Sequence, residues 1–132
     1  MSTRAVGTFS VDSWEEEAVD ERAGAKLSRA HLTKTFHGDI EGTSTTDLLL
    51  AMPPVESSAA YVGFERLVGS IHGREGSVVF HHSAIASDGA DAAPWTVVQD
   101  SGTGELTGLR GVGKLTVDVD GGHAFTLDYE LE

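Results

Sequence analysis

Apolar and polar residues alternate along most of the chain, and this period of two predicts β-strands rather than helices. In the second such segment, Ala30, Leu32, Lys34 and Phe36 share one face. Glycines, which number 16 in 132 residues, separate short stretches rich in threonine and valine, as strands joined by turns require. The expected strands are Ala5–Val11, Gly24–Phe36, Glu41–Met52, Ala59–Ile71, Ser77–Ala86, Trp95–Gln99, Gly111–Val119 and His123–Leu131.

The last two expected strands form the clearest hairpin. Apolar residues alternate with polar ones in both Gly111–Val119 and His123–Leu131, and Asp120–Gly122 lies between them. Glycine adopts positive φ without a Cβ clash, which suits a tight connection. One face of this hairpin is apolar and the other is polar, which is typical of an antiparallel sheet with one wet side.

Several features interrupt the alternation. Trp14 breaks the parity of the first strand, which indicates a β-bulge, and the acidic stretch Asp12–Glu21 fits a short helix, an edge strand or a loop. Pro53–Pro54 ends the third strand, because proline cannot donate to the ladder. Turns are expected at Gly38–Asp39 and at Gly73–Gly76.

About eight strands without a convincing helix leave two all-β solutions. A sandwich buries two inner faces against each other, whereas a barrel closes one sheet on itself. Sequential hairpins, long strands and frequent glycines favour a single antiparallel up-and-down barrel. The length fits one domain that covers residues 1–132.

The charge of the chain narrows the classes of partner. Nine Lys and Arg residues against 21 Asp and Glu residues give a formal net charge of −12. Phosphate backbones and anionic membrane surfaces attract cationic proteins, so neither nucleic acid nor a membrane is an expected partner. No apolar run approaches the roughly 18 residues of a spanning helix, and the first residues lack the apolar stretch of a signal peptide, so a cytoplasmic location is expected.

The chain contains no cysteine, which excludes disulfides, thiolate catalysis and cysteine-based zinc sites. Gly102, Gly104 and Gly108 suggest a dinucleotide-binding loop, but their spacing is one residue too long and a strand rather than a helix is expected next. A glycine-rich turn that bends the barrel is the preferred interpretation. No cofactor is therefore expected.

Metal binding also lacks a good set of ligands. Asp118 and Asp120 share a strand face beside a turn, where two carboxylates are usually solvated. His81 and His82 are adjacent in a strand and point to opposite faces, so they cannot chelate one ion together. No serine lies in a nucleophile-elbow context, so serine hydrolysis has no support.

The best candidate site combines a phenol, a carboxyl and an imidazole. Tyr61 and Glu65 share one face of Ala59–Ile71, and His82 lies on the following strand. If these faces line the barrel interior, the trio lies in an apolar tube and could perform acid–base chemistry near neutral pH. In the alternative arrangement Val62, Phe64 and Val68 form the inner face and Glu65 lies outside. An inward trio could equally be a satisfied polar network of the core.

Two tryptophans, Trp14 and Trp95, are expected to pack in the core or at the rim of the barrel. A small eight-stranded barrel is either filled by side chains or holds one small ligand, and the sequence leaves both possibilities open. Outer faces such as Val79–Ile85 would expose β-branched side chains, so self-association is expected, with a dimer as the simplest state.

Four ordered segments together carry a resemblance to a known family: Phe36–Ser44, Tyr61–Arg66, Gly69–His82 and Ser101–Gly111. They resemble a small bacterial family known as a domain of unknown function, DUF3224, which is similar in fold to allene-oxide-cyclase-like β-barrels. The resemblance covers nearly the whole chain and implies an antiparallel barrel. It implies no activity, and relatives with the same barrel shape include cyclases, so fold alone is weak support for a function.

Three functions remain open at this point. The first is a barrel that binds a small apolar molecule in its lumen without chemistry. The second is a cyclase or isomerase that acts by confinement, with Glu65 and His82 as acid–base groups and Tyr61 beside them. The third is a packed structural or assembly module.

Overall fold

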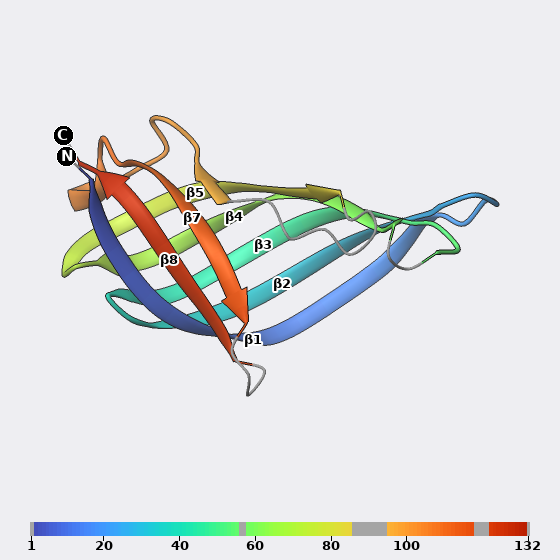
Figure 1. Cartoon of the computed structure of the whole chain (residues 1–132), viewed down its shortest axis with the longest axis horizontal. Helices are drawn as coiled ribbons and strands as arrows, with labels where there is room; N and C mark the ends of the chain where they lie inside the picture. Colours follow the sequence, from blue (N-terminus) through green and yellow to red (C-terminus); the bar gives the residue numbers. More distant parts are fainter. Residues whose placement is uncertain (1, 56–57, 86–94, 118–121, 132) are drawn as a thin grey trace.

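The computed structural model describes residues 2–55, 58–85, 95–117 and 122–131. Eight strands form a closed barrel in which each strand pairs antiparallel with the next and β8 returns to β1 (Figure 1). The predicted all-β antiparallel barrel is therefore confirmed. The strands are β1 Thr3–Asp20, β2 Lys26–Gly38, β3 Ile40–Met52, β4 Ala60–Ile71, β5 Arg74–Ile85, β6 Trp95–Val97, β7 Arg110–Val117 and β8 His123–Glu130.

The barrel has two unlike ends because its strands differ in length. β1 has 18 residues, whereas β7 and β8 have eight each and β6 has three. β8 pairs with β1 only as far as Phe9, and the second half of β1 pairs with β2 alone. The long strands β1 to β5 therefore extend beyond the short strands at one end, to the right in Figure 1. We call this end the mouth and the opposite end the closed end.

The closed half of the barrel is filled by aromatic and aliphatic side chains. Phe36, Phe80, Trp95 and Phe125 are almost completely buried in one cluster. The ring centroids of Trp95 and Phe125 are 4.5 Å apart, and Phe80 meets Phe125 edge-on at 5.7 Å. Such tilted and edge-on aromatic pairs add to the free energy gained from burial alone. The described side chains of this half therefore pack tightly against one another in the lumen.

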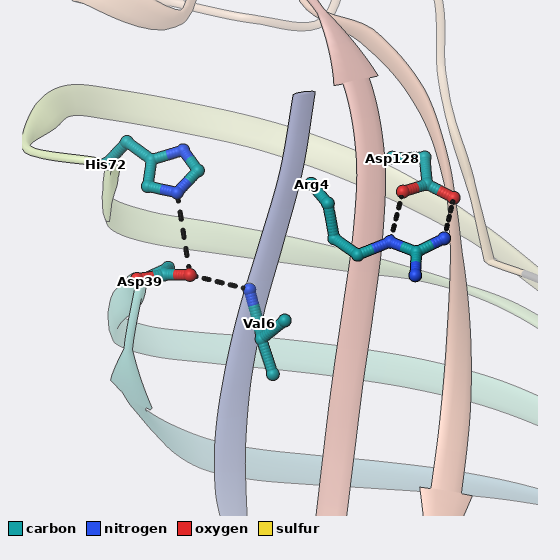
Figure 2. Close-up of polar contacts among 5 residues, drawn as sticks. All are labelled: Arg4, Val6, Asp39, His72 and Asp128. Atoms are coloured by element: carbon teal, nitrogen blue, oxygen red, sulfur yellow. Dashed lines mark hydrogen bonds and ion pairs between the residues drawn. The ribbon is translucent and has the colours of Figure 1, made fainter. Parts of the chain in front are cut away.

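Polar contacts tie the turns at the closed end to the first strand (Figure 2). A carboxylate oxygen of Asp39, in the β2–β3 turn, accepts the backbone N–H of Val6 at 2.9 Å and lies 3.5 Å from Nε2 of His72, in the β4–β5 turn. On the outer surface Arg4 donates two hydrogen bonds to Asp128, which joins β1 to β8. These contacts hold the two turns and β8 against β1, the strand at which the barrel closes.

Most sequence-based boundaries agree with the structure within two residues, and three differences are informative. The acidic stretch Asp12–Glu21 continues β1, so the helix alternative is wrong, and the predicted bulge appears as a register shift between Val11 and Ser13. The turn expected at Gly73–Gly76 is tighter, because β5 already begins at Arg74. Asp118, Asp120 and the strand ends around them lie outside the described residues.

The glycine-rich segment before β7 is a compact turn. It contains one short 3-10 helix, η2, at Gly104–Leu106, and β7 follows. Thr103 and Ser101 in this segment bond to the edge of β5 through Ser77 and Val79. The segment therefore covers the part of β5 that the short strand β6 leaves without a partner.

Candidate functional site

Strand alternation directs the predicted site residues into the lumen. On β4, Glu65 is fully buried, whereas its neighbour Phe64 is 55% exposed and lies on the outer surface with Val62 and Val68. On β5, His82 is buried and His81 points outward, as the sequence predicts. The alternative that placed Glu65 outside the barrel is therefore wrong.

Glu65 lies at the centre of a buried charged cluster, which we define as Lys34, Ser44, Glu65 and His82. The ammonium group of Lys34 donates to Oε1 of Glu65 at 2.9 Å, and the hydroxyl of Ser44 donates to Oε2. Nε2 of His82 lies 2.8 Å from the same Oε1. That nitrogen is not aligned for a hydrogen bond, so the contact is electrostatic. The side chains of Lys34, Glu65 and His82 are at most 6% exposed.

The charge states in the cluster follow from its contacts. Burial raises the pKa of Glu65, but His82, Lys34 and Ser44 together outweigh burial and hold this pKa below its usual range. Burial lowers the pKa of His82, and the carboxylate beside it only partly offsets this effect. Near neutral pH the cluster therefore holds an ionised Glu65 and a neutral His82.

Two members of the charged cluster, Lys34 and Ser44, were not among the site residues predicted from the sequence. Lys34 has the same parity as Ala30, Leu32 and Phe36, and this shared face is the signal that could have placed it inside. Its ammonium group lies 4.5 Å from the centre of the Trp95 ring and 4.9 Å from that of Phe9. Such cation–π contacts help a buried ammonium group to remain charged.

Tyr61 does not join the charged cluster. It faces the lumen, as predicted, but lies four residues nearer the mouth than Glu65 and packs against Ala30, Leu32 and Leu48. Partial burial raises the pKa of its phenol. Among the described residues it contacts neither Glu65 nor His82 through a hydrogen bond. Of the three predicted residues, Glu65 and His82 are therefore in contact, whereas Tyr61 lies apart from them.

Tyr61 instead lines a large apolar pocket at the mouth, with a volume of about 770 Å³. The ends of β1, β3 and β5 and the beginnings of β2 and β4 meet there, because antiparallel neighbours alternate in direction. All but three of the lining residues are aliphatic, and the exceptions are two serines and Tyr61 itself. The lining consists of Val19, Leu27, Ser28, Leu49, Leu50, Ala51, Ala60, Tyr61, Val62, Ser83 and Ala84.

Strand register places the charged cluster directly inside this mouth pocket. Residues paired across neighbouring strands form rows around the lumen, and two successive rows connect the pocket to His82. The outer row is Ser28, Leu50, Tyr61 and Ala84, and the next row inward is Ala30, Leu48, Gly63 and His82. His82 therefore lies one row below the pocket lining.

Comparison with known proteins identifies the family. A family described as "Protein of unknown function (DUF3224)" matches residues 5–129 of the chain. The chain belongs to the DUF3224 family. The expected family membership is thus confirmed, and no protein of the curated collection searched is similar to the chain.

A solved structure from the same family shares the fold. It is the crystal structure of a protein of unknown function from the DUF3224 family of Shewanella oneidensis MR-1. The two chains are 34% identical, the match covers 100% of this chain and 99% of that chain, and the TM-score is 0.84. The barrel is therefore a property of the family and not of this chain alone.

The two tryptophans of this DUF3224 protein have opposite environments. Trp95 is buried and stacks on His82, with ring centroids 3.9 Å apart. Trp14 is 49% exposed on β1, and its indole nitrogen donates to Glu16. The expectation of core or rim packing holds for Trp95, which lies in the core. Trp14 pairs with the buried Leu32, so it lies on the lumen-facing side of β1, where it remains half exposed beyond the last residue paired with β8.

The other clusters of titratable side chains in the described part of the DUF3224 barrel are weaker candidates for a site. In the described part of the chain, no three His, Asp or Glu side chains are grouped as metal ligands. His31 pairs with Asp47 at 2.8 Å on the outer surface, where ion pairs contribute little. No helix among the residues described has the length and apolar character needed to cross a membrane. The charged cluster and the mouth pocket are thus the features that call for a functional explanation.

Proposed function

We propose that the barrel binds a small apolar molecule at its mouth. The observation that carries this proposal is the pocket of about 770 Å³ whose lining is almost entirely aliphatic. Pockets that bind small molecules have volumes of about 300–1,000 Å³, and hydrophobic side chains with a few polar groups line them. The mouth pocket has both properties.

Exposed apolar side chains at the rim of the pocket support the same function. Leu27, Leu49 and Val62 are each more than 40% exposed at the border of the pocket, and strand alternation turns Leu49 and Val62 toward the outside of the barrel. A ligand that removes apolar surface from water gains about 25 cal/mol per Å². Such a cluster of leucine and valine side chains on a strongly acidic protein fits recognition by apolar contact rather than by charge.

The other two candidate functions receive less support. A packed structural module does not need a cavity of this size at one end of its lumen. A cyclase or isomerase would use His82 and Glu65, whose contact of 2.8 Å fits an acid–base pair. However, Glu65 is fully buried and is already held by Lys34 and Ser44, so a substrate would have to displace these contacts to react with it. Binding requires no contact with Glu65.

Filling the pocket with a larger side chain tests the proposal. The neutral apolar dye N-phenyl-1-naphthylamine should bind the wild-type protein with a saturable rise in fluorescence. The substitution Ala84→Trp places an indole among the lining residues and should weaken dye binding by about tenfold or more, because the indole occupies the volume of the ligand. The matched control is Ala23→Trp in the exposed β1–β2 turn.

The outcomes of this titration are clear. The control variant should bind the dye as the wild-type protein does, and circular dichroism should show that both variants keep the barrel. If the wild-type protein shows no saturable binding, or if Ala84→Trp binds as tightly as the wild type, the proposed function is wrong.

A further inference from the structure

We infer that the molecule bound at the mouth carries a neutral oxygen-containing group, a hydroxyl or a carbonyl, and that this end enters first and lies against His82, Trp95 and Thr46. This inference rests on the proposed function and specifies the class of ligand. A simple hydrocarbon would satisfy the mouth pocket alone. The buried polar side chains below the pocket also require a hydrogen-bonding partner.

The first argument is the position of these polar groups relative to the pocket. His82 lies one row further inward than Ala84, which lines the pocket, and its ring stacks on Trp95. Thr46 lies on β3, paired with Glu65 on one side and with Leu32 on the other. Gly63, the partner of His82 across β4 and β5, adds no side chain to the row below the pocket. A ligand that extends inward from the pocket therefore meets His82 first.

The second argument is that polar atoms at this depth lack partners. Thr46 Oγ1 and Trp95 Nε1 form no hydrogen bond with any described residue, whereas Nε2 of His82 faces Oε1 of Glu65 at 2.8 Å. Thr46 and Trp95 are 1% and 2% exposed, respectively. A buried polar group without a partner destabilises a protein, so such groups are rare and indicate a bound molecule or water. An indole N–H can only donate, so the missing partner of Trp95 is an acceptor such as an oxygen atom.

The third argument concerns charge. The charged cluster already balances the ammonium group of Lys34 against the carboxylate of Glu65 at 2.9 Å. A carboxylate or ammonium group on the ligand would add a buried charge without a counterion, which is costly. A neutral oxygen adds no charge and accepts the free N–H. The cluster therefore selects against charged ligands at this depth.

The opposite orientation makes a different prediction. A ligand with its polar end outward would place that end at the rim, where Ser28 of the pocket lining donates to Glu16 at 3.0 Å. Glu15 and Glu17 flank this residue in the sequence, so an ammonium group would be favoured there. Ligands that differ only in their head group therefore distinguish the two orientations.

The experiment compares decanol, decanoate and decylamine as competitors of the dye on the wild-type protein at neutral pH. Decanol should bind at least about tenfold more tightly than either charged analogue, because only its head group can be buried beside the charged cluster. Equal affinities, or tightest binding of decylamine, would overturn the inference.

A second measurement reports directly on the buried donors. The two indole N–H signals in a ¹H–¹⁵N spectrum are assigned with the variant Trp14→Phe. Decanol should shift the Trp95 signal as its N–H gains an acceptor. Binding of decanol without a shift at Trp95 would overturn the inference.

The variant Trp95→Phe completes the test, because it keeps a ring against His82 and removes the indole N–H. It should weaken decanol binding by about five- to tenfold, the effect of one lost hydrogen bond in a buried site, and leave binding of the apolar dye nearly unaffected. If this variant fails to fold, the competition experiment and the shift of the Trp95 signal still test the inference.

If no apolar probe binds the wild-type protein, the proposed function itself is wrong. If probes bind without regard to head group, only this inference fails.

Discussion

At the scale of single residues, the least expected feature is a lysine and a glutamate side by side inside a small barrel. Lys34 and Glu65 lie 2.9 Å apart with almost no exposure. Removing two charges from water costs several kcal/mol per ion, and mutual attraction compensates only when both partners are present. Each of the two side chains therefore depends on the other.

This dependence yields a prediction for the variant Glu65→Gln. The amide keeps the shape of the side chain but leaves the Lys34 ammonium buried without a counterion, so the free energy of unfolding should fall by about 3–5 kcal/mol. Urea denaturation followed by circular dichroism measures this change. The double variant Lys34→Met/Glu65→Gln removes both charges and should recover most of the loss. A single variant as stable as the wild type would show that the ion pair contributes nothing.

The candidate site shows how much of the barrel interior can be predicted from the alternation of residues along each strand. Alternation favoured an inward position for Glu65 and His82 but left the reverse open, because Val62, Phe64 and Val68 make the other face of β4 apolar as well. It could not show that Lys34 on β2 reaches Glu65 on β4, since this contact crosses β3. Trp14 breaks the alternation because one extra residue between Val11 and Ser13 shifts the register, after which Trp14 pairs with the inward-facing Leu32.

At the scale of elements, glycines decide how closely strands approach at the closed end. Gly42 and Gly69 are directly paired between β3 and β4. A Cβ atom on Gly69 would collide with the backbone oxygen of Glu41, so no side chain fits there. Gly24, in the β1–β2 turn, has open space around it but a φ of +104°. One glycine is thus required by contact and the other by backbone conformation.

Alanine substitutions separate these two requirements. Gly69→Ala should lower the free energy of unfolding by about 1–3 kcal/mol, because the strands must move apart to admit the methyl group. Gly24→Ala should cost about 1 kcal/mol, since only the left-handed backbone is disfavoured. Thermal or urea denaturation measures both. A larger cost at Gly24 than at Gly69 would contradict the close approach of β3 and β4.

The elements themselves were predictable where alternation is continuous and ends at a turn residue. The starts of β3 and β4 differ from the sequence prediction by only one residue. The second half of β1 was ambiguous, because three consecutive glutamates carry no period. There the strand forms because β2 offers a partner along its whole length, which is information from tertiary structure rather than from local sequence.

At the scale of the whole molecule, the core is packed at one end of the barrel and an apolar pocket opens at the other. The closed end combines the aromatic core with the ties of Asp39 and Arg4 that Figure 2 shows. The mouth instead exposes aliphatic side chains around the pocket and leaves β1 to β5 without the short strands beside them. The charged cluster lies at the boundary between these halves. This division fits the proposed binding function, which needs a recognition surface on a rigid support.

The outer surface of the barrel leads to the last prediction, self-association. The sequence located the exposed apolar face on β5, but Val79 there is half-buried. The structure shows a larger apolar face on the neighbouring strands, where Leu49, Val62, Phe64 and Val68 are 42–56% exposed. Leu49 and Val62 are direct partners between β3 and β4, so this face is continuous. Contiguous apolar patches on soluble proteins usually mark an interaction surface.

We therefore expect the protein to dimerise through the outer face of β3 and β4, with Phe64 at its centre. A ring at the centre of an interface contributes most when it is fully desolvated, so Phe64→Ser should weaken the dimer by at least about tenfold. Sedimentation at high micromolar concentration measures the dissociation constant. The control Val112→Ser changes an exposed apolar residue on β7 and should leave the dimer intact. A wild-type protein that sediments as a monomer at these concentrations would contradict the prediction. Equal weakening by both variants would place the interface elsewhere.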